Sequence, residues 1–101
     1  MEIVKEANGT ELTLKITGRI DAGTSTQLSQ EVMDSISGLT RLVFDLSGVD
    51  YISSAGLRVL IAAESSMKEQ GPMIIMGVND NLMEIFSITG FTKLMDIQPQ
   101  G

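Results

Sequence analysis

Two adjacent serines, Ser53 and Ser54, are the residues of this sequence best suited to carry chemistry. They follow the apolar pair Tyr51-Ile52 and precede a stretch with the apolar spacing of a helix. A hydroxyl at the first turn of a helix lies among free backbone N–H groups and at the positive end of the helix dipole, and both favour a negative charge. The sequence therefore indicates a place where a phosphate could be attached, as part of a reaction or as a signal.

A serine between a strand and a helix also occurs in hydrolases, but the sequence argues against an enzyme. The hydrolase motif G-x-S-x-G is replaced by I-S-S-A-G at residues 52–56. The chain has no histidine that could accept the serine proton. It also lacks a G-x-x-x-x-G-K-[ST] nucleotide-binding loop, so we do not expect it to phosphorylate itself. We therefore expect no catalytic residues, and a kinase that acts in trans.

Ser54 also has a simpler structural interpretation. A serine at the start of a helix often serves as the N-cap, where its side chain accepts a backbone N–H hydrogen bond worth about 1 kcal/mol. Ser53 is the alternative cap if Ser54 is the first helical residue, and it is also the alternative site of modification. Capping and phosphorylation are compatible, because a capping hydroxyl already faces the N–H groups that a phosphate would use.

Apolar periodicity predicts the elements that position these serines. Predicted strands cover residues 1–6, 11–17, 40–46, 73–76 and 91–97, with fraying expected over 98–101. Predicted helices cover residues 24–37, 54–70 and 79–87. Asn8-Gly9 between the first two strands is a strong hairpin signal. Because the later strands alternate with helices, crossover connections should make most of the sheet parallel.

The composition indicates one folded α/β domain over residues 1–101. A chain of this length has room for one core, and 43% hydrophobic residues argue against disorder. The net charge of −6, with only seven Lys and Arg residues, disfavours nucleic acid and favours a partner with a basic patch.

Missing residue types and segments exclude further classes. Without cysteine or histidine, we expect no thiolate or imidazole metal site, and we expect no cofactor. The N-terminus does not resemble a signal peptide, and no apolar run approaches the ~20 residues that cross a bilayer. We therefore expect a cytoplasmic protein without membrane insertion.

Four short motifs occur in the order and spacing of a known family. They are Gly18-Arg19-Ile20-Asp21, Phe44-Asp45-Leu46-Ser47 with Val49, Ser54-Ala55-Gly56-Leu57, and Ile85-Phe86 followed by Gly90-Phe91. Over most of its length the chain resembles the STAS domain, in particular the single-domain anti-sigma factor antagonists of bacteria. The resemblance implies a mixed sheet of four to five strands with helices chiefly on one face.

The resemblance also implies a protein–protein switch. An unphosphorylated antagonist of this family binds an anti-sigma factor that is also a serine kinase, and so releases a sigma factor. Phosphorylation breaks that complex, and a separate serine phosphatase restores it. Ser54 falls at the family's phosphorylated position, and we expect a monomer when the protein is free. The expected partner-binding residues are Asp21, Ser53, Ser54, Gly56, Leu57 and Arg58.

Some of these residues have structural alternatives, and two other functions stay open. Asp21 could cap the following helix or contact a basic residue of the partner, and Arg58 could be a solvated surface charge. Because Ser53 stands where the family often has an acid, the chain could be an unphosphorylated STAS scaffold subunit of a transporter or signalling assembly. A third hypothesis is a small-ligand sensor with an anion site at Ser54 and the Asn79-Asp80 loop.

Overall fold

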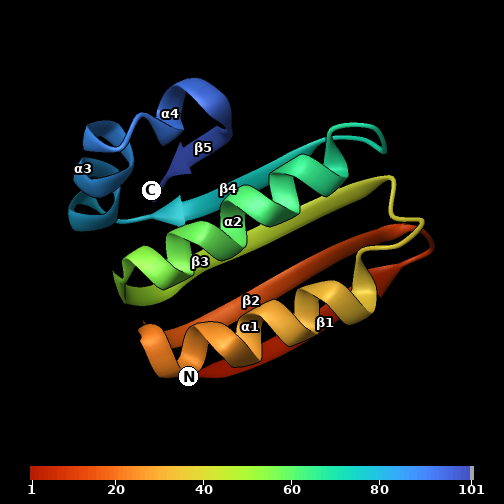
Figure 1. The fold of residues 1–101 in the computed structure, drawn as a ribbon, viewed down its shortest axis with the longest axis horizontal. Helices are drawn as coiled ribbons and strands as arrows, with labels where there is room; N and C mark the ends of the chain where they lie inside the picture. The colour runs from red at the N-terminus through yellow and green to blue at the C-terminus, as the bar shows by residue number, and fades with distance from the viewer. Residues whose placement is uncertain (101) are drawn as a thin grey trace.

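The computed structural model describes residues 1–100, which form a five-stranded sheet covered by helices (Figure 1). The strands are β1 (Glu2–Asn8), β2 (Glu11–Ile20), β3 (Arg41–Ile52), β4 (Met73–Val78) and β5 (Asp96–Pro99), and they lie in the sheet in chain order. The helices are α1 (Ala22–Ser35), α2 (Ser54–Met67), α3 (Asp80–Ile88) and α4 (Phe91–Leu94). β1 and β2 are antiparallel, and the later neighbours are parallel. The mixed α/β sheet is therefore confirmed.

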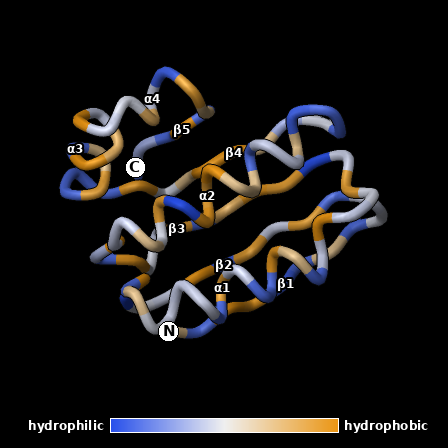
Figure 2. Tube along the Cα trace, in the orientation of Figure 1, coloured by the Kyte–Doolittle hydropathy of each residue, from blue (hydrophilic) through white to orange (hydrophobic). Residues whose placement is uncertain are grey.

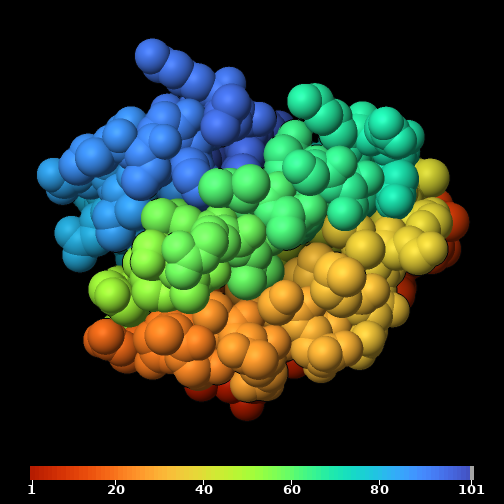
Figure 3. All heavy atoms as spheres, in the orientation of Figure 1, coloured from red at the N-terminus to blue at the C-terminus, as the bar shows by residue number. Residues whose placement is uncertain are grey.

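The helices lie chiefly on one face of the sheet, as predicted. α1 and α2 run side by side over the strands and cover most of the face seen in Figure 3. On β2 the side chains toward these helices, Leu12, Leu14 and Ile16, are buried, whereas Lys15 on the opposite face is exposed. None of the helices within residues 1–100 has the length and apolar character needed to cross a bilayer.

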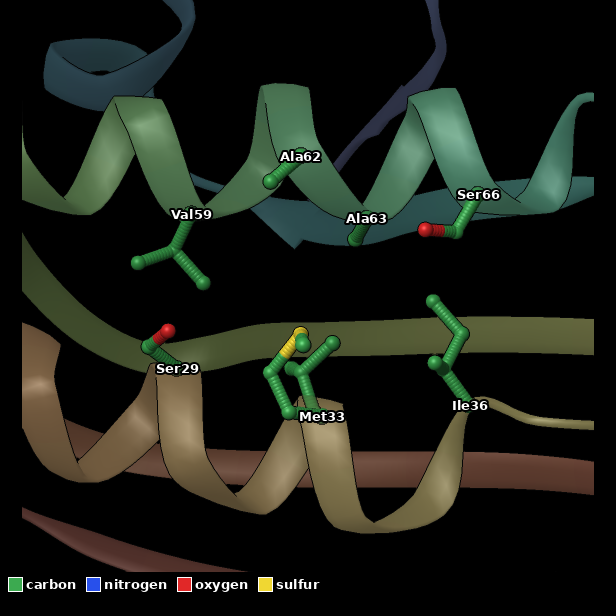
Figure 4. Close-up of a pocket in the computed structure, with 8 residues that line it drawn as sticks. Ser29, Met33, Ile36, Val59, Ala62, Ala63 and Ser66 are labelled. Carbon is green, nitrogen blue, oxygen red and sulfur yellow. The ribbon is translucent and has the colours of Figure 1, made fainter.

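The core lies between the sheet and α1 and α2. Apolar residues colour much of β3 and β4 in Figure 2, and Phe44 in β3 is fully buried. The two helices contact each other through a groove in which Val59 of α2 points toward Ser29 and Met33 of α1 (Figure 4). The cavity left in this groove is about 20 Å³, close to the space of one water molecule. Packing of α1 against α2 therefore holds both helices in fixed positions over the sheet.

β2 and β3 are both longer than predicted. From the apolar pattern, β2 was predicted to end at residue 17 and β3 at residue 46. The strands instead continue to Ile20 and Ile52. The paired strands pass a bulge, after which Thr17 lies opposite Gly48. A Cβ on Gly48 would lie only 2.6 Å from Thr17 Cγ2, so glycine permits the strands to stay paired here. The extension carries β3 directly to Ser53.

The hairpin and the helices are confirmed with shifted ends. Asn8 pairs with Glu11, so the turn contains Gly9 and Thr10, one residue later than predicted. Gly9 has a φ of 64°, a conformation that glycine adopts without steric cost. The start of α2 at Ser54 agrees with the prediction, and the other ends of α1, α2 and α3 differ from the predicted ends by one to three residues.

The strand predicted over residues 91–97 is wrong in its first half. Phe91–Leu94 form the one-turn helix α4, and β5 begins only at Asp96. Gly90 has a φ of 81°, which turns the chain, and the Phe91 ring then stacks on Phe86 with 5.7 Å between centroids. We infer that burial of Phe91 stabilises the helical turn, although the local sequence pattern favours a strand.

The predicted fraying over residues 98–101 is also wrong where the structure describes it. Gln98 and Pro99 belong to β5. The Gln100 backbone N–H donates to the Val78 carbonyl oxygen at 2.8 Å. The Gln100 side-chain amide donates to the Ser47 carbonyl oxygen at 3.2 Å. Gly101 lies outside the described residues.

Candidate functional site

The helices α1, α2 and α3 all begin at one edge of the sheet, at the left of Figure 1. Each follows the carboxyl end of a strand in the parallel part of the sheet. The Ser53 N–H donates to the Ile20 carbonyl oxygen at 2.8 Å, so α1 and α2 leave the sheet as neighbours. The Asn79 side chain donates to the Val49 carbonyl oxygen at 3.1 Å and joins the start of α3 to β3. The structure therefore brings Asp21 close to Ser53 at this edge.

Ser53, and not Ser54, is the N-cap of α2. Ser53 has an extended backbone, with φ −87° and ψ 171°, and its Oγ accepts a hydrogen bond from the Gly56 N–H at 3.2 Å. The interpretation of Ser54 as the cap is thus wrong, and the alternative, with Ser53 as the cap, is confirmed. The difference arises because β3 extends up to Ile52, which leaves one residue, Ser53, between strand and helix.

Ser54 is the first residue of α2 and is exposed. The first intrahelical hydrogen bond runs from the Leu57 N–H to the Ser53 carbonyl oxygen, and the Gly56 N–H is used by the cap. The N–H groups of Ser54 and Ala55 are therefore left for an external acceptor. Within residues 1–100, no hydrogen bond occupies the Ser54 hydroxyl. This hydroxyl is accessible to another protein and lies where a negative charge is favoured.

Gly56 and Leu57 fix the start of α2 against the sheet. Gly56 is buried, and a Cβ there would lie 2.6 Å from Ile20 Cγ2 and 2.7 Å from Ile52 Cγ1. Leu57 is half-buried and packs on the core. Only glycine thus permits the first turn of α2 to approach the ends of β2 and β3 this closely. Both residues position Ser54.

Asp21 is the N-cap of α1. Its carboxylate accepts a hydrogen bond from the Thr24 N–H at 2.9 Å, and its own N–H donates to the Thr24 hydroxyl at 2.8 Å, which together form a capping box. The backbone hydrogen bond from Thr24, followed by contact with the Thr24 hydroxyl, lowers the pKa of Asp21 below its ordinary value. The structural alternative for Asp21 is therefore observed, and it keeps a negative charge beside the start of α2.

The lowered pKa of Asp21 predicts a pH-dependent contribution to stability. A carboxyl group with a lower pKa in the folded state stabilises the fold above its unfolded pKa, and this contribution is lost as the pH falls through the folded pKa. Asp21→Asn retains a capping side chain but does not titrate. We expect a higher urea midpoint for wild type than for Asp21→Asn at pH 7, with the difference shrinking as the pH falls below the ordinary aspartate pKa of 3.8.

Asp50→Asn is the control for this measurement, because it removes one negative charge from an exposed position in β3. A difference between wild type and Asp21→Asn that stays constant with pH would contradict the role of the ionised cap.

Arg58 lies one turn after Ser54 and is exposed. The ion pairs within residues 1–100 join other cations, namely Lys5 to Glu31, Lys15 to Glu6 and Arg41 to Glu11. No ion pair in this part of the chain includes Arg58.

Sequence reasoning named Arg19 in the loop before Asp21 but missed its contact with Tyr51. The Arg19 guanidinium lies over the Tyr51 ring, 4.4 Å from its centroid, a cation–π contact. Both side chains lie at the ends of β2 and β3, where Arg19 and Tyr51 are paired in register. The two residues are far apart in sequence, and the bulge shifts the register, so no local pattern signals their contact. Both side chains are exposed and precede the buried Ile20 and Ile52, so by strand alternation they lie on the sheet face opposite the helices.

The features expected of a small-ligand site do not converge at Ser54. The Asn79 side chain accepts a hydrogen bond from the Leu82 N–H and donates to Val49, so both of its polar groups are used within the protein. Asp80 places a negative charge in the first turn of α3, which disfavours an anion there. A cavity of about 220 Å³ lies between α2 and α4 and is lined by Ile61, Glu64, Ser65, Lys68, Leu94 and Met95. This cavity includes neither Ser54 nor Asn79.

Comparisons with known proteins agree with this architecture. The model of the STAS domain family matches residues 2–100. The anti-sigma-B factor antagonist of Listeria monocytogenes is 31% identical over 98 residues, which cover 94% of this chain and 85% of the relative.

Solved structures of similar proteins have the same fold as this chain. An anti-sigma factor antagonist from Mycobacterium paratuberculosis has a TM-score of 0.88 and 25% identity, over 98% of this chain and 86% of that one. The phosphorylated form of the Bacillus cell fate determinant SpoIIAA has a TM-score of 0.76 over 95% of this chain and 90% of its own. At 13% identity this last likeness shows the fold alone. By its sequence match along nearly the whole chain, this protein belongs to the STAS domain family.

Proposed function

We propose that this protein is an anti-sigma factor antagonist controlled by phosphorylation of Ser54. In the unphosphorylated form it binds an anti-sigma factor that is also a serine kinase, and thereby releases a sigma factor. The observation that carries the proposal is the exposed hydroxyl of Ser54, which begins α2 beside two free N–H groups. Relatives named as anti-sigma-B factor antagonists, such as that of Listeria monocytogenes, support the assignment of this site to regulation rather than catalysis.

The proposed partner surface surrounds the start of α2 and consists of Asp21, Ser53, Ser54, Gly56, Leu57 and Arg58. Its members contribute differently. Ser54 and Arg58 are exposed and can contact a partner directly. Asp21 supplies a negative charge that suits a basic patch on the partner. Ser53 and Gly56 act indirectly, because one caps α2 and the other sets its distance from the sheet.

Phosphorylation would act on the interface and leave the fold unchanged. A phosphate adds about −1.5 to −2 charge at neutral pH, and the start of a helix tolerates this charge with a gain of ~0.3–1 kcal/mol. In a complex the same group would be desolvated and would lie near the Asp21 carboxylate. The phosphorylated form of SpoIIAA also has this fold.

The proposal has further consequences for the protein as a whole. The chain acts as a single domain over residues 1–101, without enzymatic activity, and is a monomer when free. A separate serine phosphatase removes the phosphate from Ser54. The protein works in the cytoplasm, where sigma factors and their regulators meet.

The test is to purify the protein from the cells that make it and to measure its intact mass together with the proteins bound to it. We expect a fraction that carries one phosphate and is free of partner, and an unmodified fraction bound to an anti-sigma factor. Protein that is never modified and remains bound in a larger assembly would indicate a scaffold subunit. A co-purified small molecule would indicate a ligand sensor.

A further inference from the structure

Arg58 is a cation whose place in α2 the fold does not explain. It lies in the second turn of the helix, it is exposed, and the ion pairs of residues 1–100 leave it out. The dipole at a helix N-terminus favours anions over cations. The first turn of α2 contains no acidic residue that would offset the positive charge. In the unmodified protein, the charge of Arg58 is therefore not balanced by its own helix.

Helix geometry directs Arg58 toward Ser54. Residues four apart in a helix lie on the same face, with about 5–6 Å between their Cβ atoms. Helical side chains lean toward the N-terminus, so that of Arg58 extends over the turn that begins at Ser54. An anion placed four residues before a cation is also the more favourable order of charges. A phosphate on the Ser54 hydroxyl would thus lie within reach of the guanidinium.

We propose that Arg58 is the intramolecular partner of a phosphate on Ser54. The guanidinium donates its paired N–H groups to the phosphate oxygens, in the geometry that arginine and phosphate share. This inference rests on the proposed function and extends it to the state of the modified protein. Before modification, Arg58 is free to contact an acidic group of the partner. After modification it pairs with its own phosphate, so phosphorylation adds negative charge to the interface and also withdraws a cation from it.

The test introduces phosphoserine at position 54 during translation, so that it depends on neither a kinase nor a binding partner. Phosphorus NMR then follows the titration of the phosphate, whose second pKa is ordinarily near 6. We expect Arg58→Gln to raise the pKa of this phosphate by about 0.3–0.7 pH unit relative to the protein with Arg58. Arg58→Lys should restore part of the difference, because lysine keeps the charge but loses the paired donors.

Arg41→Gln is the matched control, because Arg41 is an exposed arginine at the opposite end of β3. Its replacement should leave the phosphate titration unchanged, and far-UV circular dichroism should show the same fold in all variants. Equal phosphate pKa values with and without Arg58 would overturn the inference, as would an equal effect of Arg41→Gln. Different observations would contradict the proposed function. These are a kinase that does not modify Ser54, or a phosphate on Ser54 that does not affect partner binding.

Discussion

Replacing Ser54 with aspartate is expected to weaken binding to the anti-sigma factor about 100-fold and to leave the fold intact. A difference of ~3 kcal/mol in binding free energy corresponds to this two-decade change. The carboxylate adds a charge that would be desolvated in the complex, close to Asp21. Within the free protein the same carboxylate lies in the first turn of α2, where the helix dipole favours it. Isothermal titration calorimetry measures the affinity, and thermal unfolding measures the stability.

Ser54→Asn is the matched control, because asparagine has nearly the shape of aspartate without its charge. We expect this variant to bind within about tenfold of wild type, a difference of ~1.4 kcal/mol or less. Two results would count against an interface mechanism. One is unfolding of Ser54→Asp, and the other is an affinity equal to that of wild type.

Gly56→Ala is expected to destabilise the protein and also to impair the site. The added methyl group would lie 2.6 and 2.7 Å from atoms of Ile20 and Ile52, both of them buried. Overpacking of this kind costs ~1–3 kcal/mol, while the preference of helices for alanine over glycine returns at most ~1 kcal/mol. Because relief of the contact moves the first turn of α2 away from the sheet, Ser54 moves with it. Urea unfolding and partner affinity should therefore both report the change.

Gly23→Ala is the control for the glycine substitution. Gly23 is also in the first turn of a helix, but the nearest atom to its added Cβ is Asp21 Oδ1 at an ordinary 3.5 Å. We expect Gly23→Ala to keep or slightly raise the free energy of unfolding. Equal unfolding free energies for Gly56→Ala and wild type would show that the start of α2 is not tightly packed.

The hydrophobic pattern was sufficient to predict the sheet and the main helices, because these elements bury one face each. It failed where tertiary contacts decide the conformation. Phe91 lies in a helix because it stacks on Phe86, and nothing local to residues 91–97 indicates that contact. β3 passes Ser47-Gly48 as a strand because Gly48 fits against Thr17 of the neighbouring strand. Each of these results depends on residues distant in sequence.

The candidate site was predictable in its position but not in its details. The order strand, two serines, helix placed a hydroxyl at a helix N-terminus, as the structure has it. Which serine caps the helix depends on a single residue at the end of β3, and the sequence pattern does not resolve boundaries that finely. The contact between Arg19 and Tyr51 depends on the register of two parallel strands, which only the structure supplies.

The most direct measurement is to incubate the protein with ATP and the anti-sigma kinase that binds it, and to map the modified residue by tandem mass spectrometry. Our account predicts one phosphate on Ser54, retained in Ser53→Ala and absent from Ser54→Ala. A phosphate on Ser53 or elsewhere, or no modification by a kinase that does bind, would contradict it.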